Sequence, residues 1–127
     1  MPNLDDAAQY VYFAKKPKKN MDHHKRYIAA QATIFKALGH PSRLLMVDAL
    51  RGGEKCVCDL QTLVGDDVST VSKHLAVLRE AGVVTSEKRG TNIYYSLALR
   101  CLETFLACTG DLVRRRILEQ LPLLEKK

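Results

Sequence analysis

Residues 65–82 read GDDVSTVSKHLAVLREAG, and this stretch decides the fold. It opens with a three-residue turn, 65–67, whose last residue Asp67 is suited to cap a helix N-terminus. The helix that follows spans about residues 68–81, and Gly82 ends it. At about 100° per residue one face of this helix is apolar. That face carries Val71, Leu75 and Leu78.

The opposite face of this helix is small, hydroxylated and basic. Such a surface can enter the major groove of DNA, which is about 12 Å wide, and reach the base edges. Hydroxyl groups bond to bases or phosphates, and an ammonium group pairs with guanine or phosphate. The residues of this helix that we expect to contact DNA are Ser69, Thr70, Ser72, Lys73 and His74.

Three helices are expected before this stretch. The first begins near Met21 and ends at Gly39, and Pro41 opens the second, which ends before residues 52–53. A short third helix runs from near Cys58 to about residue 64. Two helices joined by a tight turn with glycine form a helix-turn-helix. The inward positions of the second helix are Leu44, Val47 and Leu50.

The pattern changes from helix to strand after residue 82. Residues 83–88 and 93–97 are rich in β-branched and aromatic side chains, and residues 89–92 have hairpin-turn chemistry. A hairpin directly after a helix-turn-helix is a wing, from which we expect Arg89 and Asn92 to contact DNA. A long helix over about residues 98–121 completes the order α-α-α-α-β-β-α. The predicted fold is therefore mainly α with a small β-hairpin, a winged helix-turn-helix.

The length of 127 residues allows one compact domain. We assign residues 21–121 to it, residues 1–20 to a flexible basic N-terminal arm and residues 122–127 to a C-terminal tail. The net charge of +6 attracts polyanions, nucleic acid first. No stretch approaches the roughly 20 apolar residues of a membrane span, and the first 15 residues lack a signal-peptide core. We therefore expect a cytoplasmic protein that binds double-stranded DNA and no membrane.

The last predicted helix carries an apolar stripe. A chain this small cannot leave such a stripe in contact with water, so we expect a homodimer joined mainly by this helix, with the first helix assisting. The two recognition helices would then meet half-sites about 34–36 Å apart on DNA. The stripe consists of Leu102, Phe105, Leu106, Leu112 and Ile117.

Four cysteines suggest metal or redox chemistry more than a disulfide framework. Cys56 and Cys58 stand at the start of the short third helix, and thiolates select soft ions. Two residues apart on a helix, the sulfurs would point to opposite sides, so one ion can bind both only if the helix start unwinds or stays non-helical. Cys101 and Cys108 share one face of the last helix, where core packing is the first interpretation.

Several motifs resemble the ArsR/SmtB family, in the right order and over about residues 27–121. They are LGHPSRL at 38–44, EKCVCDL at 54–60, VSTVSKHL at 68–75, and the wing from Lys88-Arg89-Gly90 to Tyr94-Tyr95. The resemblance implies a homodimeric winged-helix repressor that binds operator DNA and releases it when a metal or metalloid binds. It also implies Cys56 and Cys58 as the ligands. Residues 54–60 are most similar to the metal-binding segment of the family's As(III) and Sb(III) sensors. The resemblance therefore implies As(III) or Sb(III) as the inducing ion, with Cd(II) or Pb(II) as the second choice.

The sequence departs from the family pattern in three respects. Gln61 follows Leu60 where arsenic-type segments often have a third cysteine shortly after the pair. Residues 1–55 contain no cysteine, although cadmium-type sensors often add some from an N-terminal arm. No histidine follows His74, so the zinc and nickel site of the last helix is absent. The candidate third ligand is therefore Cys101, Cys108 or an exogenous thiol.

The sequence shows no nucleophile–base pairing, phosphate-binding loop or paired carboxylates, so we do not expect an enzyme. The leading hypothesis is a repressor that needs no cofactor to bind DNA and has the thiophilic ion as its inducer. A second hypothesis is a thiol-redox or persulfide sensor, in which Cys56 or Cys58 bridges to Cys101 or Cys108. A third, of another class, is a constitutive architectural DNA-binding protein.

Overall fold

A computed structural model describes residues 22–125, with side chains to Leu121. The predicted arm at residues 1–20 and the end of the predicted tail, residues 126–127, lie outside this range. The elements are α2 (His23–Leu38), α3 (Pro41–Leu50), β1 (Lys55–Cys56), α4 (Val57–Val64), α5 (Val68–Glu80), β2 (Val84–Arg89), β3 (Asn92–Leu97) and α6 (Leu102–Glu125).

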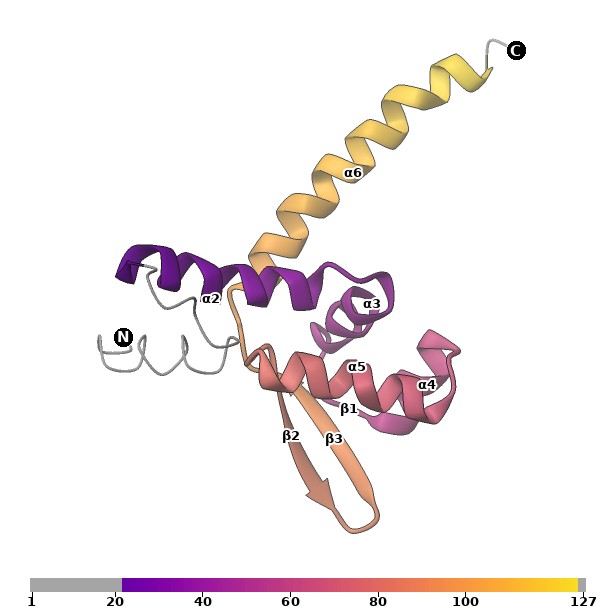
Figure 1. The fold of residues 1–127 in the computed structure, drawn as a ribbon. Coiled ribbons are helices and arrows are strands. Elements are labelled where there is room, and N and C mark those ends of the chain that lie inside the picture. Colours follow the sequence, from indigo (N-terminus) through magenta and orange to yellow (C-terminus); the bar gives the residue numbers. More distant parts are fainter. Residues whose placement is uncertain (1–21, 126–127) are drawn as a thin grey trace.

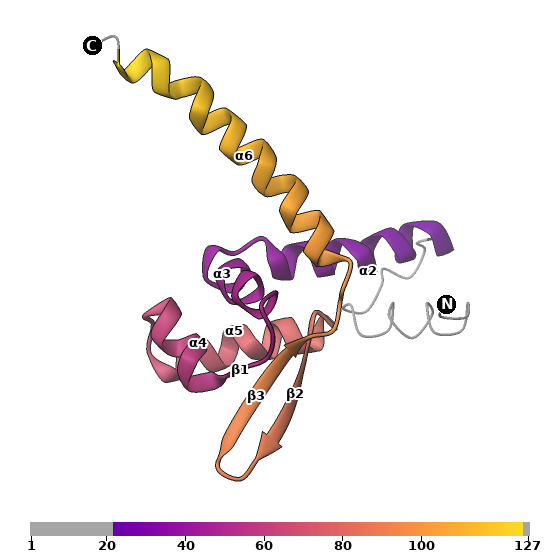
Figure 2. The same cartoon turned by 180° about the vertical axis from the view of Figure 1, so that it is seen from behind.

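The predicted mainly α winged helix-turn-helix is confirmed. Helices α3, α4 and α5 form the body, α2 lies across it, and the β2–β3 hairpin extends from it (Figure 1). Helix α6 starts at Leu102 and continues to Glu125, so it begins and ends about four residues later than predicted. Both views show α6 projecting away from the body (Figures 1 and 2).

The core lies between α3, α4, α5 and the sheet. Within it the predicted inner face of α5 is confirmed, because its three apolar residues are buried. One inward position on α3 is wrong: Leu44 is 38% exposed and Met46 is fully buried. The buried side of α3 is set by Met46, Val47 and Leu50, and helical geometry turns Leu44 about 200° from Met46.

The sheet has one strand more than the predicted hairpin. Strand β1 pairs with β3 antiparallel, with Lys55 opposite Tyr95 and Cys56 opposite Tyr94, so the strand order is β1-β3-β2. A strand of two residues is too short to show an alternating pattern in the sequence, which is why it was not predicted. The consequence is that the cysteine segment is hydrogen-bonded to the wing.

Both predicted turns are confirmed. Gly65 ends α4 in the left-handed region, with φ of 81°, a conformation that residues with a side chain rarely adopt. Asp67 then caps α5 by accepting a hydrogen bond from the Thr70 N–H at 3.3 Å. In the wing, Gly90 has φ of 63° in a two-residue loop that places Arg89 opposite Asn92.

Helices α2 and α6 expose large apolar side chains in the single chain. Phe35 on α2 meets Phe105 on α6 edge to face, with ring centroids 6.0 Å apart, yet about half of each side chain stays exposed. Further along α6, Leu112, Val113, Ile117 and Leu118 are also exposed. Within residues 22–125, no helix combines the length and apolar character that crossing a bilayer requires.

Candidate functional site

The N-terminal half of α5 presents most of the predicted DNA-contacting residues to solvent. Ser69, Ser72 and Lys73 are exposed, and Thr70 is half-buried. The Ser69 hydroxyl donates to a carboxylate oxygen of Asp67 at 2.9 Å. Hydrogen bonds from Thr70 and Ser69 hold the pKa of Asp67 below its ordinary value, so Asp67 stays charged and fixes the first turn.

His74 has a different place from the other predicted residues of α5. Its ring lies 4.5 Å from the His40 ring, centroid to centroid, and its Nδ1 lies 3.3 Å from the Arg43 guanidinium. Arg43 also donates to the Ala37 carbonyl at the end of α2, at 2.6 Å. The Arg43 side chain thus connects α2, α3 and α5. His74 is half-buried against the start of α3, a geometry that favours a structural role over a contact with DNA.

The surroundings of His74 favour its neutral form. Burial lowers the pKa of His74 most, and the electrostatic effects of His40 and Arg43 lower it further, against a smaller opposing effect of Asp66. A neutral imidazole keeps one ring nitrogen as an acceptor, and Nδ1 is the nitrogen that faces the Arg43 donor.

The wing holds Arg89 in an ion-pair cluster that the sequence did not reveal. Its guanidinium donates to both carboxylate oxygens of Glu54, at 2.6 and 3.0 Å, and to Glu87 at 2.8 Å. It also lies 4.8 Å from the centre of the Tyr94 ring. These hydrogen bonds, first that to Glu54, raise the pKa of Arg89 and lower that of Glu54. Asn92 is exposed opposite Arg89.

The backbone at Cys56 is extended, with φ of −76° and ψ of 160°, and α4 begins only at the next residue. The Cys56 Sγ caps this helix by accepting from the Asp59 N–H at 3.3 Å. Cys58 is exposed on the first turn, and its sulfur is joined to that of Cys56, with the Cα atoms 5.4 Å apart. The two sulfurs therefore meet because Cys56 lies outside the helix. This fulfils the second of the two conditions derived from the sequence, a start that stays non-helical, and the helix does not unwind.

Asp59 is a third potential ligand that sequence reasoning missed. Among residues 22–125, one group of three or more metal-binding side chains has all its donor atoms within 4.8 Å of one another: Cys56, Cys58 and Asp59. Ligand distances of about 2.0–2.3 Å place two donors of one ion up to roughly 4.6 Å apart. Once the disulfide is reduced, these three side chains offer two sulfurs and one oxygen as candidate ligands for a thiophilic ion. The signal that could have identified Asp59 as a ligand is its position directly after Cys58 in the sequence.

The structure does not bring Cys101 or Cys108 into this group. Both are free thiols and exposed, Cys101 just before α6 and Cys108 on it. They are not the partners of Cys56 or Cys58 in the disulfide, so the bridge predicted by the redox hypothesis is wrong in its pairing.

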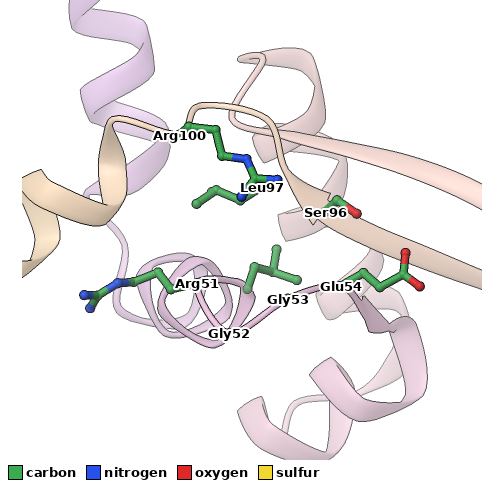
Figure 3. A pocket seen from close by; sticks show the side chains of 8 residues that line it. Arg51, Gly52, Gly53, Glu54, Ser96, Leu97 and Arg100 are labelled. Carbon is green, nitrogen blue, oxygen red and sulfur yellow. The ribbon is translucent and has the colours of Figure 1, made fainter.

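A pocket of about 270 Å³ lies between the end of α3 and the end of β3 (Figure 3). Arg51 and Glu54 extend to opposite sides of it, and Arg51 is paired with Asp48 at 3.0 Å. None of the predicted DNA-contacting residues or cysteines lines this pocket. Glu54, at its edge, instead faces the wing through Arg89.

Comparison with known proteins places the chain in a family. Residues 40–86, from the cap of α3 into β2, match the bacterial regulatory proteins of the arsR family. The chain is 33% identical over 89 residues to the cadmium resistance transcriptional regulatory protein CadC homolog of Staphylococcus aureus, covering 69% of this chain and 74% of that protein. The chain belongs to the ArsR family.

Other relatives agree with this assignment. The ArsR-family chain is 45% identical over 67 residues to the transcriptional repressor SmtB homolog of Synechocystis, a match that covers 53% of this chain and about half, 51%, of that relative. Its fold is similar to that of the homodimeric winged helix-turn-helix DNA-binding domain of Mb0332 from Mycobacterium bovis. That similarity has a TM-score of 0.66 and 27% identity, and it covers 79% of this chain and 94% of that domain. The relatives named here are described as a transcriptional regulatory protein, a transcriptional repressor and a DNA-binding domain.

The lowered pKa of His74 predicts a pH-dependent stability. An unfolded histidine titrates near about 6.5, and the folded protein releases that proton at a higher acidity. The unfolded state therefore binds more protons between these values, so the free energy of unfolding should fall as the pH drops below about 6.5. Urea unfolding near pH 7.5 and near pH 5.5 measures this dependence.

His74→Gln keeps an acceptor for Arg43 and cannot titrate, so its loss of stability on acidification should be smaller than that of the wild type. His24→Gln, on the exposed start of α2, is the control and should behave as the wild type. Identical pH dependence in the wild type and His74→Gln would contradict the structural role of this ring.

Proposed function

We propose that this ArsR-family regulator is a homodimeric repressor that binds double-stranded operator DNA and releases it when a thiophilic ion binds Cys56 and Cys58. The observation that carries the proposal is the extended backbone at Cys56. It directs both sulfurs to one place and makes Cys56 both the cap of α4 and the strand partner of Tyr94 in the wing. The candidate ion site therefore adjoins the first helix of the helix-turn-helix and the wing.

The DNA-binding part of the proposal is supported by the exposed surface of α5. Ser69, Ser72 and Lys73 lie on its outer side while its apolar face is buried, as a helix inserted in the major groove requires. The chain's net charge of +6 adds a general attraction to DNA. The Mycobacterium bovis domain of similar fold is DNA-binding, which supports this assignment.

The homodimer is supported by the apolar faces of α2 and α6. Side chains such as Val113 and Leu118 are more than half exposed in the single chain, on a helix that projects from the body (Figure 2). A second copy packed on these faces would cover them and give two α5 helices for two half-sites. The Mycobacterium bovis domain is homodimeric.

The inducer that we propose is As(III) or Sb(III), with Cd(II) or Pb(II) as the second choice. Thiolates prefer soft ions, and reduction of the Cys56–Cys58 disulfide would supply two of them side by side. Asp59 offers an oxygen donor, which a divalent cation would use more readily than As(III). For As(III), Cys101 or Cys108 or an exogenous thiol is the candidate third ligand.

A specific observation favours redox sensing as the second candidate function. The Cys56 and Cys58 sulfurs are joined to each other in a disulfide. From the reduced pair, a peroxide would form this disulfide: two electrons and two protons pass from the thiols to the peroxide, whose O–O bond breaks to give two water molecules or, from an organic peroxide, one alcohol and one water. Ion binding needs the reduced pair, so the two signals exclude each other.

The DNA surface predicts the effect of substitutions on α5. A Ser69→Ala, Lys73→Ala double variant should bind a duplex selected by the wild-type protein from a random-sequence pool more weakly. Each lost base contact costs about 1–3 kcal/mol, and each lost phosphate contact lowers the salt slope by about one. Fluorescence anisotropy at several salt concentrations measures both quantities.

Lys25→Ala removes the same charge at the exposed start of α2 and should leave the affinity nearly unchanged. Wild-type affinity in the Ser69/Lys73 double variant would rule out α5 as the reading helix.

The thiol site predicts the response to the ion. Under reducing conditions, sodium arsenite or CdCl₂ should lower the wild-type affinity for the selected duplex, on the order of 5–150-fold for a coupling of ordinary size. Cys56→Ser with Cys58→Ser should bind the duplex but not release it. The same anisotropy titration with and without the ion measures the effect.

Cys101→Ser with Cys108→Ser is the matched double variant, which should still respond unless one of these residues supplies the third sulfur. If the Cys56/Cys58 variant is released as the wild type is, the site is elsewhere. If the wild type ignores both ions but is released by peroxide, redox sensing is the function.

A further inference from the structure

The charge around Arg89 is unfavourable for a residue expected at the DNA backbone. One guanidinium is bound by two carboxylates, those of Glu54 and Glu87, which leaves the cluster net negative. Three hydrogen bonds engage both terminal nitrogens of Arg89. In this arrangement the Arg89 guanidinium is occupied by carboxylates and does not pair with a DNA phosphate.

This cluster is connected to the cysteine site through the sheet. In the register of the three strands, Tyr94 lies opposite Cys56 on one side and opposite Glu87 on the other. Directly opposite residues share one face of a sheet, and so do residues two apart on a strand. Cys56, Tyr94 and the two acidic partners of Arg89 therefore gather on one face, with the guanidinium over the Tyr94 ring.

Glu54 differs from Glu87 in its connection to the sulfurs. Glu54 is two residues before Cys56 and directly precedes β1, whereas Glu87 lies within β2. A force that moves the backbone from Cys56 to Cys58 therefore acts directly on the backbone that carries Glu54, and reaches Glu87 only through the sheet. In this structure a disulfide holds the two sulfurs together, and the Glu54–Arg89 pair is formed with both oxygens engaged.

We propose that Glu54 is a positioning residue that couples the Cys56–Cys58 site to the wing. The inference rests on the proposed function. When an ion draws the sulfurs together, Glu54 holds Arg89 and the wing loses a phosphate contact. When DNA binds, a phosphate takes Arg89 from Glu54, and the cysteine segment is released from this constraint.

The exposure of the pair makes this exchange feasible. The Arg89 and Glu54 side chains are 45% and 41% exposed, so water and salt screen their attraction, and a phosphate can reach the guanidinium without opening the core. A buried pair could not exchange its partner in this way, because the remaining charge would be left without a partner.

The test compares Glu54→Gln with Glu87→Gln, the matched variant that removes the other carboxylate on Arg89. DNA affinity is measured on the selected duplex over a salt series, with and without CdCl₂ under reducing conditions. Thiolate-to-cadmium absorbance in the absence of DNA measures ion binding separately. A merely structural role of Glu54 would change neither the salt slope nor the response to the ion.

Without the ion, both variants should bind DNA more tightly than the wild type, with a salt slope steeper by about 0.9 for each wing that gains a phosphate contact. With the ion, Glu54→Gln should lose severalfold less affinity than the wild type, although its cadmium binding without DNA is unchanged. Glu87→Gln should keep the full loss of affinity. Glu54→Asp, which retains the charge, should recover part of the response.

A Glu54→Gln variant with the wild-type salt slope and the wild-type response overturns the coupling role and leaves the proposed function intact. An equal loss of response in Glu87→Gln also overturns it, because the coupling would then not pass through Glu54. A wild type that keeps its DNA with cadmium and with arsenite overturns both the proposed function and the coupling.

Discussion

The extended backbone at Cys56 is the constraint on which the arrangement of the site depends. One residue pairs with Tyr94 in the sheet, caps α4 through its sulfur and brings that sulfur to Cys58. If α4 began one turn earlier, the sulfurs would point apart and β1 would not exist. The same dihedral angles thus create the third strand, the start of the helix-turn-helix and the candidate ion site.

From this point two physical connections lead to the DNA-binding surface. One is the packed core, which includes the buried Leu60 of α4 and Leu75 of α5; because such cores are close-packed, we expect a displacement of α4 to move α5 as well. The other is the sheet edge that joins Glu54 to the wing. The contacts of Arg43 with Ala37 of α2 and His74 of α5 hold these two helices against α3. The proposed response to an ion uses these connections and needs no large rearrangement.

The sequence predicted the elements whose signals are local. The apolar face of α5, the cap at Asp67 and the hairpin around Gly90 depend on residues close together in the chain, and all three were found. Glu54 and Arg89 are 35 residues apart in the sequence, and Arg43 and His74 are 31 apart. No local sequence pattern could therefore predict these two contacts. Strand β1 was missed because two residues carry no periodicity. The cysteines were recognised as a pair, but their common direction required the backbone dihedrals.

Thermodynamic reciprocity tests most directly whether the cysteine site and the DNA surface are coupled. Cadmium affinity is measured by thiolate absorbance for the free protein and for the protein saturated with the selected duplex, under reducing conditions. Coupling requires that DNA weaken cadmium binding by the same factor by which cadmium weakens DNA binding. Equal cadmium affinities with and without DNA would show that the Cys56–Cys58 site and the DNA-binding surface act independently.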